Sequence, residues 1–132
     1  MEELIRKIFD LPYGEKLVNV KQKPYPQVNA FLNEDLINVD VFYPGACKEN
    51  FDVRIEDDLL IIEGVFKSKE SKDVKVQFLE EFKFFDFERK FRLSKDIKKK
   101  DTVASYENGV LNIKVPIDKK KEKERKMKVK VE

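Results

Sequence analysis

Apolar and polar residues alternate with a period of two along much of the chain, which predicts strands with one buried face. Three such runs precede residue 56: Val28, Ala30 and Leu32; Ile37, Val39, Val41 and Tyr43; and Phe51, Val53 and Ile55. A more continuously apolar run at residues 59–65 predicts a more deeply buried strand. Pro44-Gly45 and Asp57-Asp58 have residue types typical of tight turns, so we expect them to separate these strands.

The dipeptide Asn108-Gly109 is the strongest turn signal in the chain. Asn and Gly tolerate the positive φ angles that a type I′ turn requires, and the twist of that turn suits two antiparallel strands. Residues 102–106 are therefore expected to pair with residues 110–115. Many short strands separated by turns, with almost no helix, predict an all-β fold, an antiparallel β-sandwich.

Two segments differ from this plan. Near the N-terminus, apolar residues recur at helical spacing and predict a short amphipathic helix that ends at Pro12; they are Leu4, Ile5, Ile8, Phe9 and Leu11. Residues 13–26 follow as an extended arm. Later, residues 74–82 alternate again within an interval that is long for a hairpin loop, so we expect a short extra strand there.

Three motifs, in the same order along the chain, resemble those of the small heat-shock proteins, the Hsp20 or α-crystallin family. Residues 43–51 (YPGACKENF) resemble L-P-G-v-x-k-e-x-i, residues 87–93 (FERKFRL) resemble F-x-R-x-F-x-L, and residues 104–111 (ASYENGVL) resemble A-x-x-x-N-G-V-L. The resemblance implies an immunoglobulin-like sandwich, the α-crystallin domain, at residues 27–117. Residues 1–26 would form its N-terminal arm and residues 118–132 a flexible C-terminal extension.

Two positions depart from the family pattern. Phe85 stands where a glycine is usual, and Ser94 replaces the usual proline. The conformation of the loop before Phe87 is therefore left open. The long interval before Arg89 still resembles the bacterial and plant type of the family, in which this loop carries a strand exchanged between subunits.

Composition narrows the class of protein further. A chain of 132 residues is long enough for one domain with a real core. Its charged fraction of 41% is well above the average of about a quarter, which indicates heavily charged flanks around a globular domain. The lone Cys47 and the lack of a secretory signal favour a cytoplasmic location. The apolar runs are much shorter than the roughly 18 residues of a membrane helix, so we expect no membrane association.

The residues of the chain do not favour an enzyme. There is no histidine to act as a base at neutral pH, so Cys47 has no imidazole partner, and we expect no catalytic residue. The neighbouring carboxylates Asp57-Asp58 and Glu80-Glu81 would point to opposite faces of a strand, so we expect no metal site. The four glycines stand singly and cannot form a phosphate-binding loop, so we expect no cofactor.

The C-terminal segment is basic. Residues 118–132 contain eight Lys or Arg and four Asp or Glu. They lack interleaved aromatic residues that could stack on bases, so a solvated, flexible spacer is favoured over a nucleic-acid arm. Val129 and Val131 fall on one face of an extended segment. This pair resembles the family's I/V-x-I/V motif, which docks into a groove of a neighbouring subunit.

The resemblance also implies positions for two interfaces. The candidate lining of the docking groove is Phe51, Val53, Ile55 and Val103; the alternative, which has most weight for Val53, is that these four are ordinary core residues. The candidate dimer interface is Val76, Phe78, Glu81 and Arg89. Glu81 is the expected carboxylate partner of a buried Arg89, and an exposed strand arginine is the alternative.

The resemblance implies an ATP-independent holdase, a homo-oligomer built from dimers, which binds partly unfolded client proteins and prevents their aggregation. The N-terminal apolar segment defined above would be its client-binding arm. The alternative is a structural or adaptor module on the same sandwich, either spore-coat-like or co-chaperone-like. An adaptor of that kind would be monomeric.

Overall fold

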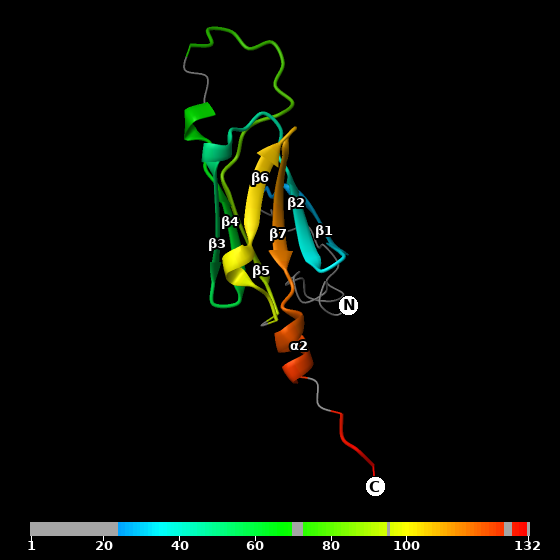
Figure 1. The fold of residues 1–132 in the computed structure, drawn as a ribbon. Helices are drawn as coiled ribbons and strands as arrows, with labels where there is room; N and C mark the ends of the chain where they lie inside the picture. The colour runs from blue at the N-terminus through cyan, green and yellow to red at the C-terminus, as the bar shows by residue number, and fades with distance from the viewer. Residues whose placement is uncertain (1–23, 70–72, 95, 126–127, 132) are drawn as a thin grey trace, which may run out of the picture.

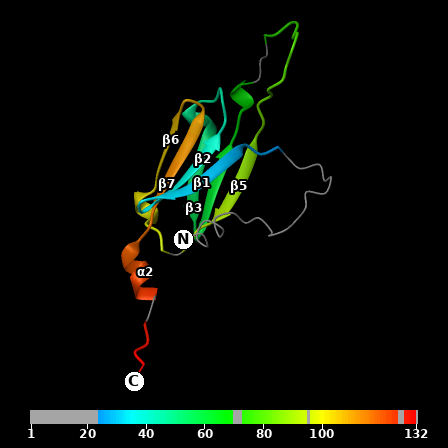
Figure 2. The same cartoon turned by 90° about the vertical axis from the view of Figure 1, so that its right-hand side faces the viewer.

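The structure, a computed structural model, describes residues 24–69, 73–94, 96–125 and 128–131. Seven strands form two antiparallel sheets that face each other (Figures 1 and 2). The first sheet has the order β1 (Gln27–Asn33), β2 (Leu36–Phe42), β7 (Val110–Pro116) and β6 (Val103–Glu107). The second has the order β3 (Phe51–Glu56), β4 (Leu59–Gly64) and β5 (Phe87–Arg92). The predicted antiparallel sandwich is confirmed. The predicted N-terminal helix lies outside the described residues.

The residue types in the turns explain the backbone conformations of the turns. Asn108 and Gly109 have φ angles of 51° and 78°, as a type I′ turn requires. The strands that they join pair from Glu107↔Val110 to Val103↔Lys114, which confirms the predicted hairpin. Asp57 takes a φ of 56° in the turn between β3 and β4, a conformation that Asp tolerates better than most residues.

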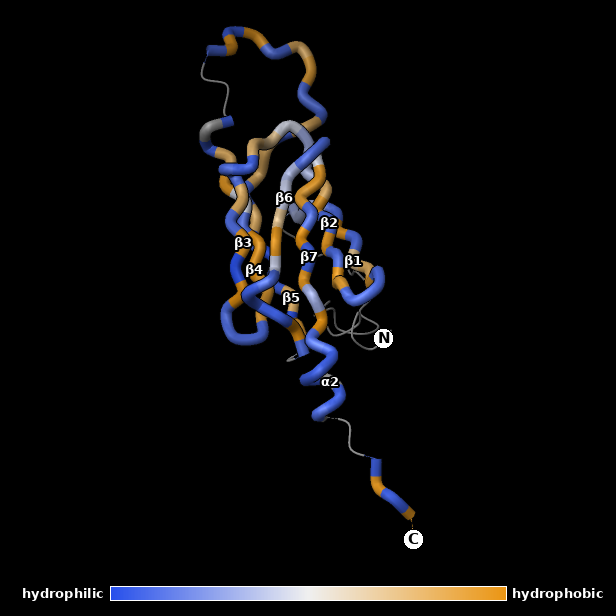
Figure 3. Tube along the Cα trace, viewed as in Figure 1, coloured by the Kyte–Doolittle hydropathy of each residue, from blue (hydrophilic) through white to orange (hydrophobic). Residues whose placement is uncertain are grey.

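The core consists of the inward-facing residues of both sheets. Ile37, Val39, Val41, Leu60, Ile62, Ile113 and Val115 are almost fully buried. Apolar residues alternate with polar ones along β2, β3 and β7, as the orange and blue segments of Figure 3 show, whereas β4 is apolar at four successive positions. Burial of alternate apolar side chains is the main source of stability of this domain, because it removes the most apolar area from water.

Tyr43 is the centre of an aromatic cluster at one end of the sandwich. Its ring stacks on Phe66 at a centroid distance of 4.2 Å. Its hydroxyl accepts the N–H of Phe85 at 2.7 Å and donates to the carbonyl of Phe85 at 2.9 Å. Burial raises the pKa of the Tyr43 hydroxyl, since the phenolate would lose its hydration. The two hydrogen bonds between Tyr43 and Phe85 fix the conformation of the loop before Phe87, which the sequence analysis left open.

Gly64 is required by the same cluster. A Cβ atom at this position would lie 2.4 Å from the ring of Phe87 and 2.6 Å from the ring of Phe66. No real Cβ contact is that short, so a side chain here would force the rings apart. The glycine therefore permits the close packing of β4 against the aromatic residues.

After η2 (Lys67–Lys69), the described residues that precede β5 begin at residue 73, and they form a loop that projects from the sandwich (Figure 1). Residues 73–86 contain no strand, so the extra strand predicted within residues 74–82 is not found in the single chain. The physical reason is that an isolated strand has no partner for its backbone N–H and C=O groups. Val76 and Phe78 are 68% and 96% exposed there.

A helix replaces the flexible spacer that the sequence predicted after the last strand. Residues Lys119–Arg125 form α2, which leads away from the sandwich (Figure 1). The Oδ1 atom of Asp118 accepts the backbone N–H groups of Lys120 at 3.1 Å and Lys121 at 3.3 Å, so Asp118 is the N-cap. Lys and Glu are good helix formers, and this cap makes a short helix possible.

Candidate functional site

The sandwich has two lateral edges, each bordered by one edge strand from each sheet. On one edge β3 lies beside β6, and on the other β5 lies beside β1. We call the edge formed by β3 and β6 the open edge, because a groove lies between these strands. We call the edge formed by β5 and β1 the closed edge, because the side chain of Arg89 bridges it. All sequence-predicted interface residues of the sandwich itself lie at one of these two edges.

The open edge contains a groove of about 400 Å³. Val53 and Ile55 of β3 and Val103 of β6 line it, so the fold brings together three of the four predicted groove residues. Val103 is 60% exposed, while Val53 and Ile55 are half-buried and also pack against the core. The sequence analysis left open whether Val53 is a groove residue or a core residue. In the structure Val53 is both, because it lines the groove and packs against the core.

Phe51 does not line this groove. Its ring lies 5.0 Å from the ring of Tyr106 and 6.0 Å from the ring of Tyr43, within the aromatic cluster. The groove is also lined by residues that the sequence analysis did not assign to it: Arg54, Lys99, Lys100, Thr102 and Ala104. The lysines belong to η3 (Lys99–Asp101), and only the fold places this connector beside β3.

The backbone of the open edge is also available for pairing. β3 and β6 are terminal strands of their sheets, so each has one side of N–H and C=O groups without a neighbouring strand of its own sheet. An extended peptide with alternate apolar residues can add to such an edge and place its side chains in pockets. The groove is therefore suited to a short extended segment.

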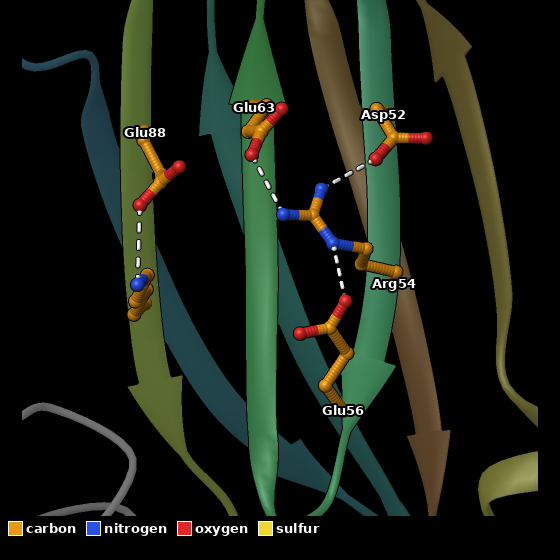
Figure 4. Close-up of polar contacts among 6 residues, drawn as sticks. Asp52, Arg54, Glu56, Glu63 and Glu88 are labelled. Carbon is orange, nitrogen blue, oxygen red and sulfur yellow. Dashed lines mark hydrogen bonds and ion pairs between the residues drawn. The ribbon is translucent and has the colours of Figure 1, made fainter.

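Arg54 lies on the outer face of β3, next to the groove. Figure 4 shows its guanidinium between three carboxylates, with nitrogen–oxygen distances of 2.7 Å to Asp52, 3.0 Å to Glu56 and 2.7 Å to Glu63. These hydrogen bonds, that of Glu63 first, raise the pKa of Arg54, and the Arg54 hydrogen bond lowers the pKa of Glu63. The guanidinium is thus already paired and ties the edge strand β3 to β4.

At the closed edge, Arg89 joins β5 to the segment that enters β1. Its Nη1 atom donates to the carbonyl of Pro26 at 3.3 Å. Its guanidinium carbon lies 5.5 Å from the ring centroid of Tyr25 and 5.0 Å from that of Phe91. Burial lowers the pKa of Arg89, because desolvation disfavours the charged form. Arg89 is therefore half-buried between aromatic rings rather than free in solvent.

The residues predicted for a dimer interface are not brought together within one chain. Glu81 is exposed on the projecting segment, and in the part of the chain that the structure describes it makes no ion pair with Arg89. Val76 and Phe78 lie on the same segment. These three residues and Arg89 thus form no single surface in the isolated protomer.

The predicted docking motif lies far along the chain from the groove. Val129 and Val131 are 71% and 92% exposed. Residues 128–131 follow α2 along the chain and lie away from the sandwich (Figure 1). In this conformation, the tail does not occupy the groove of its own chain.

Two further observations concern the described residues only. No group of three or more His, Cys, Asp or Glu side chains there is arranged to hold a metal ion. None of the helices in the described part of the chain has the length and apolar character that a membrane crossing requires.

The chain was compared with known proteins. The model of the "Hsp20/alpha crystallin family" matches residues 30–132. The probable 15 kDa heat shock protein of Leptospira interrogans is 31% identical over 92 residues, which cover 69% of this chain and 68% of that protein. Small heat shock protein C4 of Rickettsia felis is 29% identical over 107 residues, 80% of this chain and 63% of that protein.

A solved structure shows the same arrangement of strands. Heat shock protein 16.0 from Schizosaccharomyces pombe superposes with a TM-score of 0.64 and 25% identity over 83% of this chain and 98% of that one. The residues that the family model matches include most of β1 and all of β2 to β7. The chain belongs to the Hsp20/alpha crystallin family, the small heat-shock proteins.

Proposed function

We propose that this protein is an ATP-independent holdase that binds partly unfolded proteins and keeps them from aggregating. Membership of a chaperone family supports a chaperone role in general. The observation that carries the finer proposal is the open apolar groove between β3 and β6, in a chain whose tail bears two alternate valines. Such a chain can assemble by filling its own exposed grooves and can release them again.

Assembly through the tail is the first step of the proposal. Val129 and Val131 of one copy enter the groove of another and contact Val53, Ile55 and Val103. The exposed valines and the unpaired strand edges support this step, because docking removes both from water. The direction of α2, away from its own sandwich, favours docking between copies over docking within one chain.

Dimer formation is the second step. The projecting segment carries Val76 and Phe78, which are exposed and apolar. We propose that this segment pairs as a strand with an edge of a partner copy, which would cover these side chains and satisfy its backbone groups. In the partner's presence Glu81 could reach Arg89, which has no carboxylate partner in the described chain. A variant without residues 75–81 should then be a folded monomer.

Client capture uses the surfaces that dissociation uncovers. These are the groove and the N-terminal apolar segment, Leu4, Ile5, Ile8, Phe9 and Leu11. Binding by apolar contact is tolerant of client sequence and needs no nucleotide. We place the protein in the cytoplasm, where its lone Cys47 would stay reduced.

The test is suppression of aggregation. A heat-sensitive client is warmed with and without a near-stoichiometric amount of the protein, in the absence of ATP, and light scattering is followed. We expect the scattering to be suppressed. Unchanged scattering at a severalfold excess would refute the holdase proposal, and a monomer by sedimentation would favour an adaptor.

A further inference from the structure

A large pocket lies at the end of the open edge. It has a volume of about 850 Å³. Its walls come from the turn between β3 and β4, the end of β5, η3 and the start of α2; they are formed by Asp57, Asp58, Ser94, Ile97, Lys98, Lys99, Lys100, Asp101, Asp118 and Lys121. We call it the end pocket. Lys99 and Lys100 line both this pocket and the groove, so the two lie next to each other.

The tail has a longer apolar pattern than its two valines. Met127, Val129 and Val131 stand at alternate positions, with Lys126, Lys128 and Lys130 between them. In an extended segment, residues two apart lie on the same face and about 6.6 Å from one another. A docked tail would therefore present three apolar side chains on one face and three lysines on the other.

We propose that the end pocket holds Met127 of a second copy of this chain, while Val129 and Val131 of the same tail occupy the groove. This inference rests on the tail docking proposed above and extends it to a third anchor. It also sets the direction of the tail, which enters at the end pocket and runs along β3 toward the aromatic cluster.

Size and burial support this assignment. The end pocket has about twice the volume of the groove, and methionine is longer than valine and adapts to irregular spaces. The side chain of Ile97 is almost fully buried and gives the pocket an apolar wall. In the reverse direction the residue next to Val131 at the end pocket would be Glu132, whose side chain falls on the opposite face, so the apolar wall of Ile97 would meet no apolar side chain of residues 127–132.

The acidic wall of the end pocket also offers partners for the lysines of the tail. Asp57 and Asp58 form the wall on the β3 side, and neither makes an ion pair in the described chain. Lys126 and Lys128 flank Met127, and their long side chains can reach these carboxylates from the opposite face of the tail. The lysines of the pocket come from η3 and α2, so they lie on different walls from the turn.

Disulfide trapping between two differently sized full-length copies tests the proposal, with Cys47→Ser in both. The acceptor copy carries Ser94→Cys in the end pocket, a nearly isosteric change that keeps all charges. The donor copy carries either Met127→Cys or Glu132→Cys. A third pair, Val103→Cys with Val129→Cys, reports on the groove. We expect mixed dimers on a non-reducing gel from the Met127→Cys donor and from the groove pair, and none from the Glu132→Cys donor.

The other outcomes are distinguishable. Trapping by the Glu132→Cys donor instead of the Met127→Cys donor would show the reverse direction and overturn the proposal. Trapping by the groove pair alone would leave the end pocket without its anchor, while tail docking would stand. If no pair is trapped, tail docking itself fails, and this inference fails with it.

A second measurement avoids cysteine chemistry. Met127→Ala should raise the protein concentration at which the assembly dissociates by about tenfold, whereas Met127→Leu, which keeps the apolar volume, should leave it within about twofold. Sedimentation velocity over a dilution series gives this concentration. Equal behaviour of the alanine variant and the unchanged protein would overturn the third anchor.

Discussion

The two edges of the sandwich are built differently, although each brings one edge strand of one sheet next to one of the other. At the closed edge, Arg89 bridges β5 to the residues before β1 through the Pro26 carbonyl and the ring of Tyr25. At the open edge, β3 and β6 are separated by a groove, and the apolar Val103 is 60% exposed. One edge is therefore satisfied within the chain, and the other is left for another chain.

The difference shows how a small sandwich divides stability and assembly between its edges. The closed edge uses a half-buried cation whose partners are neutral, so it is sensitive to the loss of any of them. The open edge is held by exposed ion pairs around Arg54, which contribute little to stability. We infer that changes at the open edge alter assembly more than folding, and that changes at the closed edge lower the stability of the domain in addition to any effect on the proposed dimer contact.

The largest effect is expected from substitutions in the tail that abolish its docking in the groove of the open edge. Replacing Val129 and Val131 by Ala should reduce the particle toward dimers, because each buried valine contributes on the order of 1.5 kcal/mol and the loss repeats at every subunit. Sedimentation velocity measures the change. Ala at Lys123 and Glu124 of α2 serves as the control and should leave the mass unchanged. A double valine variant with the original mass would mean that the tail acts only as a solubiliser.

A smaller effect, on the stability of the domain as well as on the proposed dimer contact, is expected at the closed edge. Arg89→Ala removes the hydrogen bond to Pro26 and the contacts with two rings, and should lower the free energy of unfolding by about 2 kcal/mol. Thermal unfolding would show this as a fall in Tm. Arg92→Ala, exposed on the same strand, is the matched control and should stay within about 0.5 kcal/mol. Equal losses from the two variants would contradict the bridging role.

A third substitution distinguishes an effect on folding stability from an effect on assembly at a single position. Val103→Ser removes an exposed apolar side chain from the groove, so unfolding should change by less than about 0.5 kcal/mol. Tail docking should weaken by about 1 kcal/mol, or roughly fivefold in the dissociation constant. Denaturant unfolding and a dilution series report the two quantities. A loss of stability without a change in assembly would place Val103 in the core rather than the groove.

The smallest effect is expected from the exposed ion pairs of the open edge. Arg54→Gln should lower Tm slightly at neutral pH. Because Arg54 lowers the pKa of Glu63 in the folded protein, its contribution is present above the ordinary carboxyl pKa of about 4.3 and is lost as the pH falls through the lowered value. The difference from the unchanged protein should therefore disappear in strong acid and shrink in about 1 M salt.

A matched control for this last substitution is Lys114→Gln, which removes an exposed positive charge from β7. Its Tm should not depend on pH in the same way, since no ion pair of Lys114 is seen in the described chain. A pH-independent difference for Arg54→Gln would show that its aliphatic stem, and not its charge, supports the sheet.

The sequence by itself determined those features that depend on neighbours along the chain. Alternate apolar residues predicted the strands, because a half-buried strand needs one apolar face whatever it packs against. Asn108-Gly109 predicted its hairpin, since few other residues accept both positive φ angles. The cap of α2 was equally local, for Asp118 precedes good helix formers, yet the density of lysines there favoured the interpretation as a flexible spacer.

The tertiary structure decided how distant segments meet. Val53 and Val103 lie fifty positions apart, and only the stacking of the two sheets makes them walls of one groove with Lys99 and Lys100. The same holds for Arg89, whose partners at residues 25 and 26 come from the start of the domain. The strand predicted within residues 74–82 needs a second edge that a single chain does not supply, because backbone hydrogen bonds between strands are contacts between segments and not properties of either one.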